Sequence, residues 1–191
     1  SYIITQSLKK LKQEDKDIAL NPKQFRLLGH EGFIDISELD VYDPSISNNV
    51  YYKIMPKTIG NQEEMVVITY STKYRAYQES IRQEQIGRAL KAISTSGKIK
   101  RTKSNPNDPA RFIKSTNTTI NGEVADNVLH ELDLEAIEQE KMYDGFYAVS
   151  TNADEDIEEI IKVNKNRWMI EECFRIMKTD FSARPVYLGR E

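Results

Sequence analysis

The sequence predicts a mixed fold of the α/β class, with the irregular alternation of helices and strands that α+β proteins show. Two short runs rich in β-branched and aromatic residues, VYYKIM and MVVITY, are typical of strands. Apolar residues at helical spacing from Tyr74 to Ile93 indicate a long helix. A third β-rich run, FYAVST, precedes a second helical pattern near the C-terminus. With 191 residues, the chain is long enough for one large core or two small ones.

The N-terminal third is expected to contain strands at both of its ends. We expect a first strand over Tyr2–Ser7 and a short charged helix within Leu8–Leu20. Asn21-Pro22 is a plausible helix start, because Asn caps helices and Pro suits the first turn. The two β-rich runs place strands at Tyr51–Met55 and Met65–Tyr70, and the sequence between them favours a hairpin.

A long helix should follow the second of these strands. Ser71 is the expected N-cap, and the helix should run over about 73–94. A further helix is expected at Leu134–Met142, then a turn at Asp144-Gly145 and a strand at Phe146–Thr151. The final helical region should begin just after this strand.

Composition limits the classes of function. Hydrophobic residues make up 39% of the chain and charged residues 30%, which is typical of a polar globular protein. The formal net charge is -3, so any binding of nucleic acid must come from local charge. A single cysteine, Cys173, forms no internal disulfide and suits a reducing compartment. No apolar run is long enough to span a membrane, and we expect no membrane contact.

One segment, from Gln85 to Asn107, is strongly basic and contains no acidic residue. Two interpretations are equally weighted: a solvated loop, and a patch that faces phosphate groups. The segment contains no aromatic residue, so base stacking is not expected in it. Its cations are Arg88, Lys91, Lys98, Lys100, Arg101 and Lys103.

The stretch NRWMIEECFRIMK near the C-terminus carries the main functional pattern. On a helix of about 100° per residue, Glu171 lies roughly 40° and Lys178 roughly 20° round from Arg167. One carboxylate is therefore flanked by two cations, an arrangement that suits a divalent cation beside a phosphate backbone. The alternative is an ordinary amphipathic helix with a weak i,i+4 ion pair between Arg167 and Glu171, which the spacing alone favours.

The same residues resemble those of the DDE transposases of bacterial insertion sequences. One branch of that family carries the signature Tyr-x2-Arg-x3-Glu-x6-Lys, and Arg167, Glu171 and Lys178 match it in type and spacing. The flanking stretches DGFYAVSTN and FSARPVYL are similar to the family's DGYY-type strand and RPVY tail. Asn164 stands where the family has the signature tyrosine. The resemblance is clear over 144–188 and weaker over 70–90.

The resemblance implies a partial RNase H-like catalytic fold, interrupted by a mostly β insertion domain. Residues 1–7 and 144–191 would belong to the catalytic core, and residues 8–143 would form the insertion domain. In the family, two aspartates and one glutamate hold two Mg²⁺ (or Mn²⁺) ions. Both aspartates would then precede Ser1, and we expect a fragment that is inactive by itself.

The resemblance also implies roles for individual residues. Glu171 would be the catalytic metal ligand, while Arg167 and Lys178 would bind DNA phosphates. Asn164 and Arg175 could add phosphate contacts. The implied activity is metal-dependent phosphodiester cleavage and strand transfer on double-stranded DNA, at transposon ends and target. A homodimer in the synaptic complex and a cytoplasmic, nucleoid-associated location in a bacterium are also implied.

Two alternatives stay open. The chain could be a non-catalytic DNA-binding or assembly domain that keeps an RNase H-like remnant. It could also be an unrelated α+β interaction domain with a chance motif. The last alternative predicts that the strand near Tyr2 and the strand at Phe146 do not lie side by side.

Overall fold

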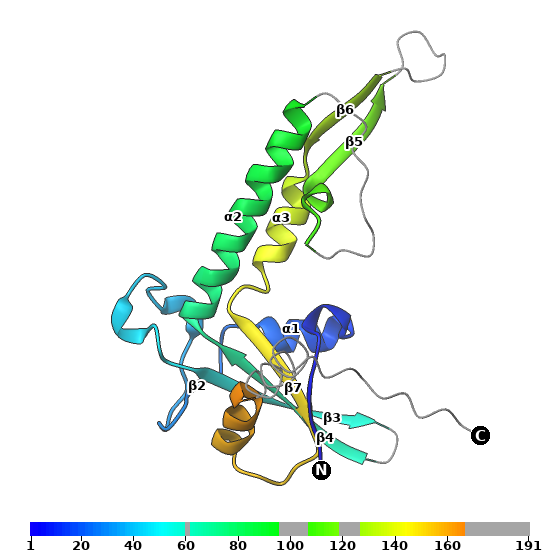
Figure 1. Ribbon diagram of the computed structural model, residues 1–191. Helices are drawn as coiled ribbons and strands as arrows, with labels where there is room; N and C mark the ends of the chain where they lie inside the picture. The colour runs from blue at the N-terminus through cyan, green and yellow to red at the C-terminus, as the bar shows by residue number, and fades with distance from the viewer. Residues whose placement is uncertain (60–61, 96–106, 119–126, 167–191) are drawn as a thin grey trace, which may run out of the picture. The chain divides into compact units, whose positions relative to one another are not determined.

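A computed structural model describes residues 1–59, 62–95, 107–118 and 127–166 of the chain. These residues form a mixed α+β fold, which confirms the predicted class (Figure 1). Their α-helices are α1 (Gln13–Leu20), α2 (Thr72–Ser94), α3 (Leu134–Lys141) and a fourth helix at 157–166. Short 3-10 turns are η1 (Leu8–Lys10), η2 (Ile36–Glu38), η3 (Pro44–Ile46) and η4 (Pro109–Phe112).

Five of the seven described strands form one sheet, in the order β1-β7-β4-β3-β2. The strands are β1 (Ile3–Thr5), β2 (Arg26–Leu27), β3 (Tyr51–Ile59), β4 (Gln62–Tyr70), β5 (Ile113–Thr118), β6 (Asn127–Leu132) and β7 (Phe146–Thr151). Strands β1 and β7 are antiparallel, with Ile3 opposite Thr151 and Thr5 opposite Val149. The strand near Tyr2 therefore does lie beside the Phe146 strand, which contradicts the prediction made by the chance-motif alternative.

The chain divides into two compact units. The first contains Ser1–Gln6, Ile54–Val67 and Val149–Glu191, and the second contains Ser7–Lys53 and Ile68–Ala148. The boundary passes through β3, β4 and β7, so each of these strands contributes to both units. The expected division into 1–7 with 144–191 and 8–143 concerns a family-level domain assignment, and it stays a prediction.

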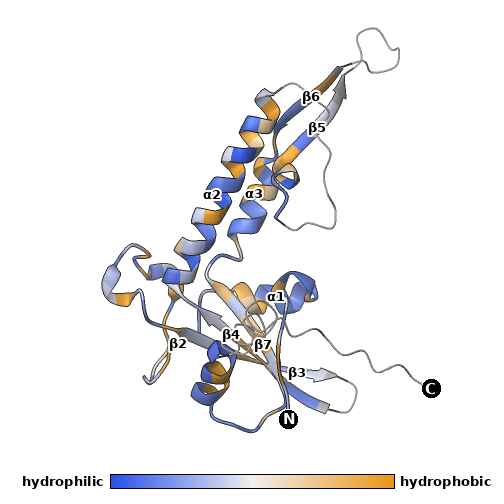
Figure 2. Ribbon diagram, viewed as in Figure 1, coloured by the Kyte–Doolittle hydropathy of each residue, from blue (hydrophilic) through white to orange (hydrophobic). Residues whose placement is uncertain are grey.

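In the second unit, α3 and the β5–β6 hairpin lie alongside α2 (Figure 1). Ala89 of α2, Phe112 of η4 and Ile137 of α3 form their buried core, which Ile113 and Leu132 of the hairpin also contact. Figure 2 shows hydrophobic and hydrophilic residues alternating along α2, as a helix packed on one side requires.

A polar cluster joins the same elements. The guanidinium of Arg111 donates to both carboxylate oxygens of Glu140, at 3.1 and 3.0 Å. It also donates to Oε1 of Gln85 at 2.5 Å. Gln85 is buried, so its amide oxygen needs this donor. The cluster thereby fixes η4 between α2 and α3.

Lys53 of β3 holds the end of α1. Its Nζ donates to the carbonyl oxygens of Ile18, Asn21 and Lys23, at 2.8, 2.6 and 3.3 Å. The ammonium also lies 4.6 Å from the centre of the Phe25 ring. Burial lowers the pKa of Lys53 to about 8. This one side chain satisfies the carbonyl of Ile18 in the last turn of α1 and that of the C-cap Asn21.

Three local predictions agree closely with the structure. Helix α2 begins after the N-cap Ser71, whose hydroxyl accepts from the Tyr74 N–H, and it ends at Ser94. Strand β7 has the predicted bounds, and α3 ends one residue before Met142. In the two helices the apolar period and the polar cap indicate the same element, and in β7 the Asp-Gly turn and the apolar run do so.

Other predictions were wrong or incomplete. No helix starts at Asn21-Pro22: Asn21 is the C-cap of α1, and its side chain accepts from the Lys23 N–H at 3.0 Å. The same short polar side chain that caps helix starts can instead close a turn. Residues 8–20 form η1 and α1 separately, because Leu11 adopts an extended conformation between them. The described part of residues 8–143, expected to be a mostly β domain with a long helix at about 73–94, contains α1, α2 and α3 together with strands.

Candidate active site

Of the residues predicted to form the site, the structure describes Asn164. It lies half-buried in the helix at 157–166. The other four, Arg167, Glu171, Arg175 and Lys178, lie outside the described residues. The site is therefore built from the elements that lead to them: the turn before β7, the strand itself, and the turn and helix that follow.

A buried ion pair fixes the entry to β7. The Arg82 guanidinium of α2 binds both carboxylate oxygens of Asp144, and its Nη1–Oδ1 distance is 2.7 Å. Both residues are buried. This hydrogen bond and the negative charge of Asp144 raise the pKa of Arg82. Asp144 therefore has a structural role, because its ion pair with Arg82 orients the chain at the start of β7.

The next residue, Gly145, has no room for a side chain. Its φ is +82°, in the region that favours glycine, and its N–H donates to Oε1 of Gln78 at 2.7 Å. A Cβ would lie 2.6 Å from the Tyr70 ring and 3.0 Å from the Ser71 carbonyl oxygen. The Asp-Gly turn therefore brings the backbone directly against the start of α2.

Strand β7 then continues into a buried environment. Phe146 packs edge-on against Tyr70, with ring centres 5.1 Å apart. Residues 148–151 are all buried. The Ser150 hydroxyl donates to Oε2 of Glu64 on β4 at 3.0 Å, so a polar side chain in this buried strand has a partner.

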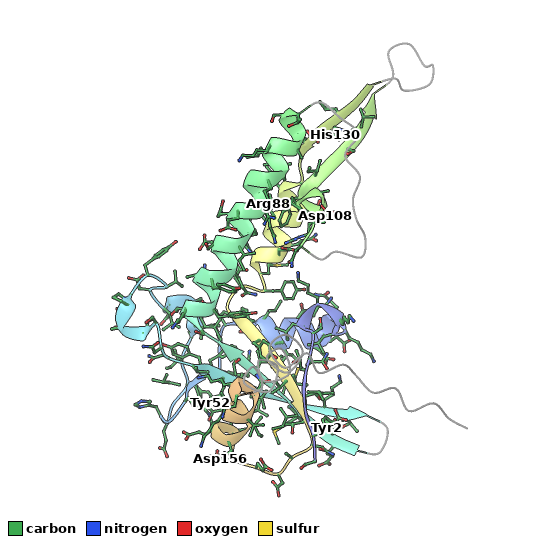
Figure 3. The ribbon with its side chains drawn as sticks, viewed as in Figure 1. Tyr2, Tyr52, Arg88, Asp108, His130 and Asp156 are labelled. Atoms are coloured by element: carbon green, nitrogen blue, oxygen red, sulfur yellow. The ribbon has the colours of Figure 1, made fainter. Side chains whose placement is uncertain are left out.

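The turn after β7 is bound to the N-terminal segment. The hydroxyl of Thr151 donates to the carbonyl oxygen of Tyr2 at 2.6 Å. Oδ1 of Asn152 accepts from the N–H of Tyr2 at 3.0 Å. Thr151 Oγ1 also accepts from the Ala153 N–H at 3.0 Å. Figure 3 labels Tyr2 in this part of the molecule, together with Asp156 just before the fourth helix.

The fourth helix starts with a polar cap and packs through two isoleucines. Oδ1 of Asp156 accepts from the Glu158 N–H at 3.4 Å, and its carboxylate suits the positive end of the helix dipole. Ile160 and Ile161 are buried. Asn164 lies four positions after Ile160 and three after Ile161, so it is on the same side of the helix.

Within the described ranges, no group of three or more His, Cys, Asp or Glu side chains could hold a metal ion. Nδ1 of His130 on β6 lies 2.8 Å from the hydroxyl of Ser115 on β5. From the basic segment, Arg88 and Lys91 are exposed on α2, and Figure 3 labels Arg88 there. Lys98, Lys100, Arg101 and Lys103 lie outside the described residues.

Sequence reasoning missed the residues that bind the C-terminal end of β7 to the N-terminal segment. The sequence pattern places Thr151 at the end of a strand and Asn152 at the start of a helical region, and it predicts no partner for either. Their partners are backbone atoms of Tyr2, which no side-chain pattern reveals. The one available indication was a pair of polar residues at the end of a buried apolar strand, a position where polar groups need partners.

Comparison of the chain with protein-family models, with curated proteins and with solved structures found no match. Among the helices that the structure describes, none has the length and apolar character needed to cross a lipid bilayer.

Proposed function

We propose that the chain is part of a DDE transposase that cleaves and joins DNA at insertion-sequence ends with the help of divalent metal ions. The observation that carries the proposal is the pattern Arg167-x3-Glu171-x6-Lys178 between DGFYAVSTN and FSARPVYL. A chance helix would supply the ion pair, but it would not supply both flanking stretches.

The order of elements supports the proposal. The motif requires a strand, a polar turn and a helix before the glutamate, and the chain has β7, the turn at 152–156 and the helix at 157–166 in that order. The pairing of β1 with β7 also supports it, because both strands belong to the catalytic core in the proposal. The RNase H-like assignment of residues 1–7 and 144–191, with 8–143 as an insertion, is part of the same proposal.

The chemistry explains the residue types. The carboxylate of Glu171 is a hard oxygen donor of the kind that Mg²⁺ and Mn²⁺ prefer. It is the single metal donor that the motif offers, and the proposal assigns the other two to aspartates outside this sequence. Bound metal ions would activate the attacking water or 3′-hydroxyl and stabilise the leaving oxygen.

The cations would position the DNA. The planar guanidinium of Arg167 can hold a phosphate through two hydrogen bonds, and Lys178 supplies a second positive charge along the backbone. Asn164 can donate an amide hydrogen to a phosphate, and Arg175 can add a contact. Double-stranded DNA as partner, a synaptic homodimer and a bacterial cytoplasmic, nucleoid-associated location are parts of this proposal.

The test is the substitution Glu171→Gln in a full-length protein that contains this chain. It should abolish Mg²⁺-dependent cleavage of a DNA substrate, because the neutral amide is a poor metal ligand, while leaving DNA binding largely intact. Glu172→Gln makes the same charge change one position along and should retain cleavage. Retained cleavage in Glu171→Gln would refute the ligand role. DNA binding without any cleavage in the unsubstituted protein would favour the non-catalytic DNA-binding domain.

A further inference from the structure

Helix α2 has a buried face whose residues hold the second unit together. Arg82, Gln85 and Ala89 are buried on this face. The Arg82 guanidinium binds the Asp144 carboxylate. Gln85 accepts a hydrogen bond from Arg111, and Ala89 belongs to the core that α2 shares with η4 and α3. At about 100° per residue, the three buried residues lie within roughly 60° of one another round the helix.

Another face of α2 is exposed and mainly basic. Lys73, Arg88 and Lys91 are exposed, and Figure 3 labels Arg88 on the helix. Within the ranges that the structure describes, none of these three side chains forms an ion pair or a hydrogen bond. Counted from Lys73, Arg88 lies roughly 60° round the helix and Lys91 returns to roughly the same line. Glu84 is the acidic residue in this sector, so the cations outnumber it three to one.

Two tyrosines add aromatic surface to the same face. Tyr74 and Tyr77 lie with ring centres 6.3 Å apart and ring planes 21° from parallel. Tyr74 is 37% exposed and Tyr77 is 60% exposed, so both rings reach solvent. Tyr77 lies roughly 40° round from Lys73, between the lines of Lys73 and Arg88. Aromatic residues beside cations are typical of interaction surfaces, and a tyrosine hydroxyl can donate to a phosphate oxygen.

The length of this row of cations indicates the kind of partner. Lys73 and Lys91 lie about five turns apart on one helix, which is about 27 Å along its axis. A DNA duplex carries a phosphate about every 3.4 Å along each strand, and it makes one turn in about 34–36 Å. A straight row of cations of this length can therefore contact phosphates near both of its ends. A folded acidic protein also attracts cations, but its carboxylates follow no such regular spacing.

We propose that this face of α2 is a DNA-binding surface that contacts the phosphate backbone of a duplex. The basic face, as we name it, consists of Lys73, Tyr77, Arg88 and Lys91. The choice of DNA as the partner rests on the proposed function, whereas the face itself is defined by residues of α2. The basic segment of the sequence supplies Arg88 and Lys91, and its residues up to Ser94 are helical rather than a loop. This favours the phosphate-facing interpretation of that segment.

The test is a triple variant, Lys73→Gln with Arg88→Gln and Lys91→Gln, in a full-length protein that contains this chain. The probe is a DNA duplex of random sequence, and fluorescence anisotropy at several salt concentrations gives the affinity. Loss of three phosphate contacts should reduce the slope of log K against log salt by about 3 and weaken binding about tenfold or more at 0.1 M salt. Glutamine is a good helix former, so far-ultraviolet circular dichroism should show unchanged helix content.

A second triple variant, Lys9→Gln with Lys12→Gln and Lys141→Gln, is the matched control. It removes the same charge from three exposed lysines on other elements, and Lys9 and Lys141 already have acidic partners. This variant should keep the slope and the affinity. A further measurement uses the unsubstituted protein, in which bound duplex should protect Lys73 and Lys91 from acetylation and leave Lys12 reactive, as read by mass spectrometry.

The outcomes separate the inference from the proposed function. An unsubstituted protein that binds no DNA overturns both. Unchanged slope and affinity in the basic-face variant overturn the inference alone, and so does an equal loss in the control variant. Poly-glutamate that binds the basic face as tightly as the duplex does overturns DNA as the partner. DNA binding that depends on the basic face, in a protein without metal-dependent cleavage, supports the inference and overturns the transposase.

Discussion

Replacement of Arg82 by methionine should destabilise the protein by about 3–5 kcal/mol, the usual effect of removing one partner of a buried ion pair. The side chains of Arg82 and Asp144 are 5% and 10% exposed, and two hydrogen bonds join them. Methionine fills much of the same volume but leaves the carboxylate of Asp144 without its guanidinium. The penalty is the cost of keeping that charge away from water.

The size of the effect makes it easy to measure. For a chain of 191 residues, each kcal/mol shifts the midpoint of thermal unfolding by about 2–4 °C, so Arg82→Met should lower it by about 6–20 °C. Urea unfolding at pH 7, followed by far-ultraviolet circular dichroism, gives the free energy directly. Lys141→Met is the control, because the Lys141–Glu138 pair is exposed and its loss should change stability by about 0.5 kcal/mol or less.

A double-mutant cycle isolates the interaction. Asp144→Asn should also destabilise, because it leaves the Arg82 charge unpaired. The double variant should then lose clearly less than the sum of the two single losses, since neither charge remains buried alone. Additive losses, or a loss below about 1 kcal/mol for Arg82→Met, would show that the pair is not the buried, coupled contact that its geometry indicates.

Two further predictions concern a buried lysine and a DNA contact. The ε-ammonium of Lys53 should titrate near pH 8 in nuclear magnetic resonance of the lysine side chains. Because an unfolded lysine has a pKa of 10.5, the unfolded chain binds more protons between these values. The free energy of unfolding should therefore rise from pH 8 to 10.5, and titration above pH 10 would contradict the assigned burial. Arg167→Ala should weaken DNA binding and reduce the slope of log K against log salt by about 1, as loss of one phosphate contact does. An unchanged slope would mean that Arg167 does not contact a phosphate.

The elements that the sequence predicted well are those in which local signals agree. Helix α2 combines a serine cap with a long apolar period, and β7 combines a glycine turn with a continuous apolar run. The β5–β6 hairpin was missed, because IKSTNT and NVLHEL are polar or irregular in pattern. Its stability comes from packing against α2 and η4, and a single-sequence pattern contains no information about that packing.

For the proposed site, the sequence indicates only the types of side chain and their spacing. The motif names Arg167, Glu171 and Lys178 because their chemistry and spacing are visible in the sequence. The contacts of Thr151 and Asn152 are made with the backbone of Tyr2, and any residue at position 2 other than proline has the same N–H and C=O groups. Such contacts depend on the pairing of β1 with β7, and the register of that pairing becomes visible only in three dimensions.

Strand β7 is fixed at both ends, by a different kind of interaction at each. At its start, the Arg82–Asp144 pair supplies stability through charge in a buried setting, and its loss should appear in unfolding measurements. At its end, Thr151 and Asn152 bind the backbone of Tyr2 through neutral hydrogen bonds. Each of these hydrogen bonds contributes only about 1 kcal/mol to stability. The two ends should therefore respond differently to substitution. Arg82→Met should lower the midpoint of thermal unfolding by clearly more than Thr151→Val does. Equal shifts of the midpoint in the two variants would show that the buried ion pair stabilises the fold no more than the neutral hydrogen bonds do.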